Sequence, residues 1–316
     1  MPNLMLTNWC NYKCPYCFGI DFMAPKVAKE NMSEETFCGI LEWLSKTPEI
    51  RAIHLMGGEP TLHPDFEWFV ETLLAKDYHI TVFSNLATPQ SQVYAAKLAD
   101  LPVRWVVNIN PPHTWNEIRR HRILTSLAIL GGKASLTFNV MPDEEDNEWA
   151  LELTRKYNLS REIKVGFVLP TVTGSNYSLT DSQYADVANE VVKLAVKAEK
   201  DDIVLRYECG VPTCSFTEEQ LGILWDTGSI FSSTCYSKLD ITPSGECIYC
   251  LPMATKGAVH YSTFDTYRDA KQWFEKKWQP YRLLGHTEEC HTCNLMTPHT
   301  CHGGCLAKML LHAKNV

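Results

Sequence analysis

The sequence predicts an α/β protein, a partial (βα)6-type parallel barrel followed by a C-terminal cysteine-rich domain. Strand-like and helix-like segments alternate from about residue 4 to about residue 205, and this alternation predicts a parallel sheet with right-handed crossovers. About six strands are visible, which suggests a barrel that does not close. Beyond this stretch the chain is rich in Cys, Thr, Ser, Gly and Pro. We therefore predict two domains, residues 1–205 and 206–316.

The strands are predicted from short β-branched and aromatic runs bounded by turn residues. After a first strand near residue 4, they are expected at residues 51–56, 79–84, 103–109, 133–140 and 163–169. A hairpin is expected at residues 239–250, turning at Pro243-Ser244-Gly245.

The helices are predicted from apolar residues at helical spacing. They are expected at residues 33–46, 64–76, 89–100, 115–130, 145–157 and 181–200. Ser33 is a suitable N-cap for the first of them, and Phe37, Ile40 and Leu41 lie on its apolar stripe. Cys38, next to this stripe, is expected to be a buried core thiol.

Composition and charge exclude several classes of protein. The 316 residues are 45% hydrophobic and 21% charged, which argues against a disordered or fibrous chain. The net charge of −8 does not suit a protein that binds nucleic acid. Neither a long apolar run nor a signal peptide is present, so we expect a cytoplasmic protein without a membrane partner.

The 13 cysteines suggest metal binding. Their number is odd and nothing marks the chain as secreted, so a disulfide framework is a poor interpretation. They also cluster: three lie between residues 10 and 17, and nine between residues 209 and 305.

The first cluster, Cys10, Cys14 and Cys17, has the spacing C-x3-C-x2-C. Three thiolates on one loop can hold three irons of a [4Fe–4S] cube and leave the fourth iron open to a small molecule. The alternatives are a zinc loop that lacks its fourth ligand, or three unrelated thiols.

This loop, placed after the first strand of a βα repeat, resembles the cluster loop of the radical S-adenosylmethionine (radical SAM) enzymes. Tyr16 stands where that family has an aromatic residue. Gly57-Gly58-Glu59-Pro60 resembles the family motif that contacts the amino group of SAM, although Gly-Gly alone could be an ordinary turn. Ser84-Asn85 matches the family's contact near the ribose, and a stretch that begins at Asn108 matches a further polar contact. Arg120 stands where the family has an arginine that could pair with the SAM carboxylate. The alternative is that Arg120 is only an exposed residue at a helix start.

The resemblance implies the chemistry. The open iron would bind SAM, and one electron from the cluster would cleave SAM to methionine and a 5′-deoxyadenosyl radical that takes a hydrogen atom from the substrate. An electron donor such as flavodoxin or ferredoxin would then be a partner.

The C-terminal cysteines resemble the SPASM domain, which holds auxiliary [4Fe–4S] clusters in many radical SAM enzymes. By that pattern Cys235, Cys250 and Cys305 would share one cluster, and Cys290, Cys293 and Cys301 the other. The gap between Cys293 and Cys301 is longer than usual, and the family's last cysteine is missing. The alternative is a zinc module. The histidines among these cysteines, His286, His291, His299 and His302, are expected to be polar loop residues rather than ligands.

Two cubes need eight thiolates, so two ligands remain to be found. Cys209, Cys214 and Cys247 are the candidates. On a regular strand Cys247 and Cys250 point to opposite faces, so we predict that Cys209 and Cys214 complete the clusters and that Cys247 is spare.

Three functions follow. The first is a peptide-modifying enzyme that cross-links, epimerises or oxidises a side chain, in which Cys247 is a weak candidate for a hydrogen donor. The chain starts at its first strand, so a peptide is expected to bind the core itself or to arrive on another protein. The second is a small-molecule enzyme, such as an aminosugar or cyclitol dehydrogenase. The third, a non-enzymatic Fe–S or zinc module, leaves residues 57–60 and 84–85 unexplained.

Overall fold

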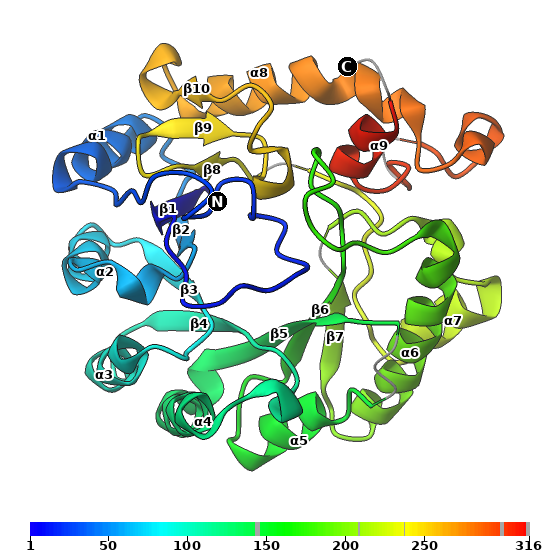
Figure 1. Cartoon of the computed structure of the whole chain (residues 1–316), viewed down its shortest axis with the longest axis horizontal. Coiled ribbons are helices and arrows are strands. Elements are labelled where there is room, and N and C mark those ends of the chain that lie inside the picture. Colours follow the sequence, from blue (N-terminus) through cyan, green and yellow to red (C-terminus); the bar gives the residue numbers. More distant parts are fainter. Residues whose placement is uncertain (143–145, 208, 237, 298–299, 314–316) are drawn as a thin grey trace.

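A curved sheet with helices on its outer side organises the chain (Figure 1). The computed structural model describes residues 1–142, 146–207, 209–236, 238–297 and 300–313. Seven strands follow one another in the sheet in chain order, and each is parallel to its neighbours. They are β1 (Asn3–Thr7), β2 (Ala52–Gly57), β3 (His79–Ser84), β4 (Val103–Asn108), β5 (Ala134–Val140), β6 (Glu162–Phe167) and β7 (Val204–Tyr207). The predicted parallel α/β fold is therefore confirmed.

The helices between these strands agree in number and order with the sequence patterns. They are α1 (Glu34–Ser45), α2 (Phe66–Ala75), α3 (Pro89–Lys97), α4 (Glu117–Leu130), α5 (Trp149–Lys156) and α6 (Asp181–Glu199). Ser33 caps α1, accepting a hydrogen bond from the backbone N–H of Thr36 at 3.1 Å. The predicted start of the fifth helix, Glu145, lies outside the described residues.

The two faces of the sheet differ in burial. In β5 the side chains of Ala134, Leu136, Phe138 and Val140 are buried, while the residues between them are partly exposed. β6 alternates in the same way. The buried side chains belong to one continuous core with the helix residues, and the helices surround the ring of strands on the outside (Figure 1). The partly exposed side chains therefore face the inside of the ring.

The chain after β7 extends the same sheet from its other edge. The remaining elements are α7 (Glu218–Asp226), β8 (Asp240–Ile241), β9 (Glu246–Ile248), β10 (Val259–His260), α8 (Tyr267–Trp278) and α9 (Leu306–His312). The predicted hairpin is present as β8 and β9, and β8 pairs in parallel with β1. The cysteine-rich part of the chain is thus joined to the barrel by backbone hydrogen bonds, at the strand that precedes the first cysteine loop.

The sequence analysis missed two features of this sheet. β7 follows the six expected strands, and the order of the sheet continues through residue 205. The hairpin was expected as a local unit of the second domain, whereas it is part of the main sheet. The division into residues 1–205 and 206–316 stays a prediction.

Candidate functional site

The loop after β1 brings its three cysteines together. It crosses the centre of the ring of strands (Figure 1). The backbone N–H of Cys17 donates to the carbonyl of Cys14 at 3.1 Å, which folds the second half of the motif into a turn. The pKa of the Cys10 thiol is raised to about 12, chiefly by burial; Glu59 and the thiols of Cys14 and Cys17 add to this shift, and the N–H of Tyr12 opposes it. The three thiols thus lie within electrostatic range of one another, and a bound cation would reverse this shift because ligand thiols bind deprotonated.

Gly57 and Gly58 hold this loop against the end of β2. The N–H of Gly58 donates to the carbonyl of Thr7, and the N–H of Glu59 donates to the carbonyl of Trp9, both at 2.8 Å. A Cβ atom on Gly58 would lie 2.2 Å from the Trp9 carbonyl oxygen, and one on Gly57 would lie 2.3 Å from that of Thr7. Only glycine allows backbones to approach this closely. The Gly-Gly pair is therefore needed for packing against the cysteine loop itself.

Glu59 is a fully buried carboxylate that links β2 to β3. One of its oxygens accepts hydrogen bonds from the Ser84 hydroxyl at 2.8 Å and the Thr61 hydroxyl at 2.6 Å, and the other accepts from the N–H of Asn85 at 2.7 Å. Burial raises its pKa, and the hydrogen bonds oppose that shift. Pro60, the first residue of a short 3₁₀ helix (Pro60–Leu62), is buried beside it. This network fixes the ends of β2 and β3 next to Cys10.

Two asparagines reach the thiols from the ends of β3 and β4. The side-chain amide of Asn85 donates to Asn11 at 2.8 Å and lies 3.9 Å from the sulfur of Cys10. That of Asn110 lies 3.8 Å from the sulfur of Cys14, and its oxygen accepts a hydrogen bond from the Tyr16 hydroxyl. Asn108, which the sequence analysis selected, is the exposed last residue of β4. In the same stretch, Asn110 is the residue that contacts the loop.

The side chains of Arg120 and its neighbour Arg119 point toward different parts of the protein. Arg120 is exposed; it donates to the carbonyl of Pro112 at 3.0 Å and lies over the ring of Trp115. The guanidinium of Arg119 lies 4.6 Å from the ring centre of Tyr12, which belongs to the cysteine loop. Arg119 is therefore the arginine of α4 that contacts the loop, and sequence reasoning missed it.

The segment after β6 covers the same loop, and no sequence signal marked it. The N–H of Tyr177 donates to the carbonyl of Pro15 at 2.9 Å, and the side-chain amide of Asn176 donates to the carbonyl of Tyr16 at 3.2 Å. Residues after β1, β2, β3, β4 and β6 thus meet at the carboxyl ends of the strands, where sheets of this kind bind their ligands.

Four C-terminal cysteines gather around Cys250; Cys305 is buried, Cys235 and Cys250 are half-buried, and Cys209 is exposed. Burial raises the pKa of Cys250 well above its ordinary value, and the nearby Cys235, Cys305 and Cys209 raise it further. The chain at Cys209 packs directly on the chain at Cys305, since a Cβ atom on Gly210 would lie 2.9 Å from the Gly304 carbonyl oxygen and 3.1 Å from the N–H nitrogen of Cys305. We call these four cysteines the Cys250 group.

Four of the other five C-terminal cysteines form a second group around Cys214. Burial raises the pKa of Cys214, and the neighbouring Cys290, Cys301 and Cys293 also raise it. Gly285 passes close by with a φ of +68°, and a Cβ atom there would lie 2.3 Å from the Cβ atom of Cys290. We call these cysteines the Cys214 group. Each predicted set of three is thus joined by one of the two predicted extra cysteines.

Both groups suit a cluster in their ligand chemistry, since each offers four thiols and [4Fe–4S] cubes take four cysteines. Among the residues that the structure describes, no three Cys, His, Asp or Glu side chains surround one point as the ligands of a single metal ion do. A [4Fe–4S] cluster is wider than a single metal ion, so the cysteines that bind it lie farther apart than the ligands of one ion.

The structure contradicts one prediction about the cysteines and speaks against another. Cys38 is exposed, because it lies on α1 one position past the buried Phe37 and its side chain turns away from the core. Cys247 is fully buried on β9 and belongs to the apolar core. A hydrogen donor must meet its substrate, so this packing speaks against that role for Cys247.

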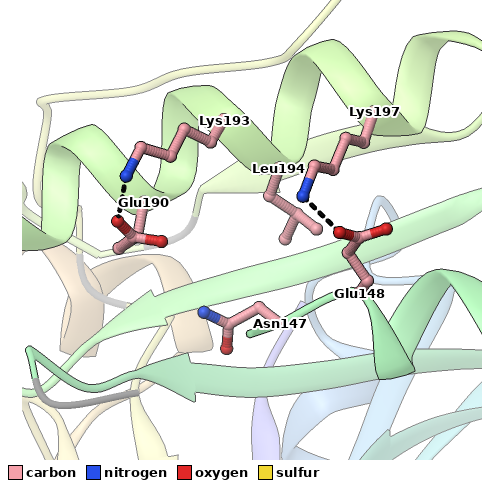
Figure 2. Close-up of a pocket in the computed structure, with 6 residues that line it drawn as sticks. All are labelled: Asn147, Glu148, Glu190, Lys193, Leu194 and Lys197. Atoms are coloured by element: carbon pink, nitrogen blue, oxygen red, sulfur yellow. Dashed lines mark hydrogen bonds and ion pairs between the residues drawn. The ribbon is translucent and has the colours of Figure 1, made fainter. Parts of the chain in front are cut away.

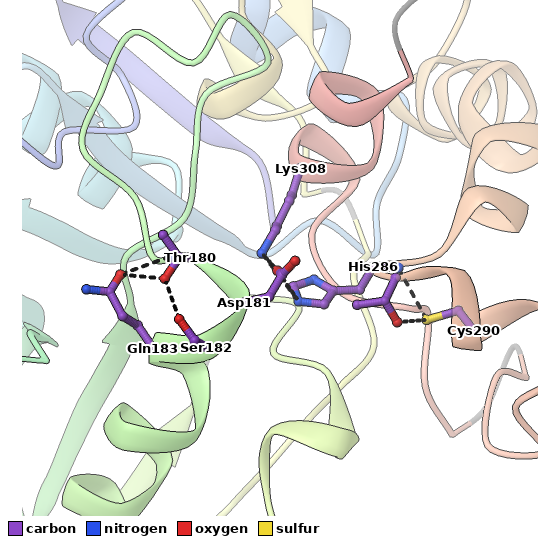
Figure 3. A network of polar contacts seen from close by, with 8 residues as sticks. Thr180, Asp181, Ser182, Gln183, His286, Cys290 and Lys308 are labelled. Atoms are coloured by element: carbon purple, nitrogen blue, oxygen red, sulfur yellow. Dashed lines mark hydrogen bonds and ion pairs between the residues drawn. The ribbon is translucent and has the colours of Figure 1, made fainter.

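Two of the C-terminal histidines, His286 and His302, lie in loops as expected, but both are buried. His302 accepts a hydrogen bond from the N–H of Cys235 at 3.0 Å through its Nδ1. His286 belongs to a network in which the buried Lys308 of α9 contacts both its ring and the carboxylate of Asp181 (Figure 3). The backbone N–H of His286 donates to the sulfur of Cys290 at 3.3 Å. His291 is exposed, and His299 lies outside the described residues.

A pocket of about 370 Å³ lies between the start of α5 and the middle of α6 (Figure 2). Its charged side chains pair with each other, Lys193 with Glu190 and Lys197 with Glu148. Such exposed ion pairs contribute little to the free energy of unfolding. None of the cysteines lines it, so this pocket is separate from the sites above.

Comparison with known proteins agrees with this geometry. The profile of the family described as the radical SAM superfamily matches residues 4–177. One curated relative, an S-adenosylmethionine-dependent nucleotide dehydratase of Selenomonas ruminantium, is 30% identical over 83 residues, and the match spans only 26% of this chain and 28% of that protein.

Two solved structures share the fold at low sequence identity. SuiB of Streptococcus suis bound to the precursor peptide SuiA superimposes with a TM-score of 0.69 at 13% identity, over 97% of this chain and 71% of SuiB. Native anSMEcpe with bound AdoMet gives 0.70 at 15% identity, over 96% of this chain and 89% of that one. Among the described residues, no helix is long and apolar enough to cross a membrane.

Proposed function

The chain belongs to the radical SAM superfamily, and we propose that Cys10, Cys14 and Cys17 hold a [4Fe–4S] cluster with one iron open to SAM. One observation carries the proposal: the three thiols meet at the carboxyl ends of the strands, against the glycine pair that ends β2. With cluster and SAM bound, the site would supply reductive cleavage of SAM to methionine and a 5′-deoxyadenosyl radical, which abstracts hydrogen from the substrate.

The residues around the thiols would bind and orient SAM. Gly57, Gly58, Glu59 and Pro60 form the wall at β2, while Ser84 and Asn85 end β3. Buried Glu59 holds Ser84 and the backbone of Asn85 in place, so the two motifs act as one rigid unit. Tyr16 and Asn108, with Asn110, would border the site from the loop and β4.

An arginine of α4 is proposed for the SAM carboxylate, because guanidinium and carboxylate pair with good geometry. The family resemblance favours Arg120. Contact with the loop through Tyr12 makes Arg119 a second candidate.

We propose that the Cys250 group and the Cys214 group each hold an auxiliary [4Fe–4S] cluster, as in SPASM-type enzymes. The protein would then contain about 12 irons per chain, against about 8 or 4 with fewer clusters. Replacing Cys209 or Cys214 with Ala is expected to remove iron, whereas replacing the exposed Cys38 with Ala is expected to leave it unchanged. Unchanged iron in the first two variants would refute these ligand sets.

The proposed substrate is a peptide, on which the enzyme would cross-link, epimerise or oxidise a side chain. The structure of SuiB with its precursor peptide supports this choice, since the chain matches 97% of its own length to that fold. The electron is proposed to come from a flavodoxin or ferredoxin.

A small-molecule substrate is the alternative, and the local match to a nucleotide dehydratase favours a nucleotide over the aminosugar or cyclitol considered first. The test is transfer of deuterium into 5′-deoxyadenosine, with deuterated candidate peptides and deuterated nucleotides offered separately. Label from a peptide alone supports the first function, and label from a nucleotide alone refutes it.

A further inference from the structure

Arg282 is half-buried and places a positive charge beside the Cys250 group. It lies in a 3₁₀ helix (Gln279–Leu284) that follows α8. Its Nη2 donates to the carbonyl of Cys235 at 2.6 Å and to the hydroxyl of Tyr249 at 2.5 Å. The guanidinium carbon lies 6.0 Å from the ring centre of Tyr249. These contacts hold the guanidinium next to one of the four cysteines.

The surroundings of Arg282 leave part of the guanidinium unsatisfied. Its Nη1 is buried and has no hydrogen-bond partner in the part of the chain that the structure describes. Among the described residues, no carboxylate forms an ion pair with it. A buried donor and a half-buried charge without partners are both costly, so such a group is retained only where something compensates it.

Lys308 provides a contrast in the same region. It is a fully buried cation near the Cys250 group, because it follows Cys305 on α9. Its ammonium group contacts the carboxylate of Asp181 and the ring of His286 (Figure 3). A carboxylate thus compensates the charge of Lys308, whereas the groups that face Arg282 are the cysteines and a phenol.

The negative partner that fits Arg282 is the cluster itself. Burial alone would lower the pKa of Arg282, but Cys235 and Tyr249 raise it above its ordinary value. Arg282 in turn lowers the pKa of the Cys305 thiol, so its charge acts on two members of the group. Four thiolates make a bound cluster negative. A guanidinium with a free N–H can neutralise part of that charge and donate a hydrogen bond to a cluster sulfur.

We propose that Arg282 is a positioning residue that raises the reduction potential of the cluster held by the Cys250 group. The inference rests on the proposed function, because it needs that cluster to be present. Reduction adds one electron and therefore one negative charge, with no bond formed and no proton moved. A nearby cation and an N–H donor to sulfur both favour the reduced state.

The test is a redox titration of the full chain, monitored by electron paramagnetic resonance under anaerobic conditions with dithionite as the one-electron source. It uses a background in which Cys10, Cys14 and Cys17 are all Ala, so that only the auxiliary clusters contribute. The iron content of this background is measured first, and about 8 irons per chain are expected. A background without iron would refute the auxiliary clusters of the proposed function and is read separately from the potentials.

In this background, Arg282→Gln is expected to shift the midpoint potential of one auxiliary signal downward and leave the other in place. Arg282→Lys keeps the charge but not the planar pair of donors, so a smaller downward shift is expected. The control is Arg268→Gln on α8, where the arginine is exposed and pairs with Glu49. It should leave both potentials unchanged.

Unchanged potentials in Arg282→Gln, with full iron, would overturn the inference. If Arg282→Gln binds less iron, Arg282→Lys decides: a lowered potential supports the inference, and an unchanged one overturns it.

Discussion

The substitution Gly58→Ala tests how the cysteine loop is held. The new Cβ atom would lie 2.2 Å from the Trp9 carbonyl oxygen, 2.4 Å from its carbonyl carbon and 2.9 Å from the backbone nitrogen of Cys10. All three are backbone atoms, so no side-chain rotation can relieve the overlap. The loop must move away from the end of β2 by about 1 Å to restore ordinary contact distances.

This movement breaks the contacts that fix the first cysteine. The hydrogen bonds from Gly58 to Thr7 and from Glu59 to Trp9 would lengthen or be lost, at about 0.5–1.5 kcal/mol each. Overpacking of this kind costs about 1–3 kcal/mol. Together we expect the free energy of unfolding to fall by about 2–6 kcal/mol and Cys10 to move relative to Cys14 and Cys17.

Two measurements check this expectation: urea unfolding, and iron per chain in a variant background that retains only the first three cysteines as ligands. The matched control is Gly222→Ala on α7, where an added Cβ atom has no heavy atom within 4 Å. That control should keep its iron and be slightly more stable, since alanine favours a helix over glycine. Wild-type iron content and stability in Gly58→Ala would refute the assigned role of the glycine.

Three further predictions concern groups around the site. In Glu59→Gln, an amide N–H₂ group would face the buried backbone N–H of Asn85 or Thr61, which would then lack an acceptor. The free energy of unfolding should therefore fall by about 1–3 kcal/mol in urea unfolding. An unchanged free energy of unfolding would contradict the network around Glu59. Burial raises the pKa of Asp240 from 3.8 to about 6, so the folded protein retains this proton between about pH 4 and 6, and in that range stability should decrease by about 1.4 kcal/mol per pH unit as the pH rises. Asp240→Asn should remove that slope in thermal unfolding between about pH 4 and 6, and an unchanged slope would assign it to other groups. Arg119→Ala should raise the SAM concentration needed for half-maximal cleavage more than Arg120→Ala does; the reverse order would favour the arginine chosen by family resemblance.

Much of the fold could be predicted because its elements have clear local patterns. The strand expected at residues 79–84 has those bounds in the structure, and Ser33 caps its helix as expected. β7 was missed because four residues give too short a pattern. The pairing of β8 with β1 joins residues about 237 positions apart, and no local pattern contains that information.

The side chains that contact the cysteine loop lie one or two positions from those chosen from the sequence, and this difference has a geometric cause. Asn110 rather than Asn108 reaches Cys14, and Arg119 rather than Arg120 contacts the loop. Neighbouring positions on a helix point about 100° apart, so motif matching finds the segment but not the side chain. The same reason explains the exposed Cys38. The grouping of Cys209 with Cys250 and of Cys214 with Cys290 depends on tertiary packing alone.

The most direct test of the account is the formation of 5′-deoxyadenosine from SAM by the anaerobically reconstituted protein with dithionite. We predict that the wild-type chain forms it and that the variant with Cys10, Cys14 and Cys17 all replaced by Ala does not, although that variant should retain about 8 irons. Equal product from both proteins, or none from a wild-type chain that holds about 12 irons, would contradict the central claim that these three cysteines hold the cluster that cleaves SAM.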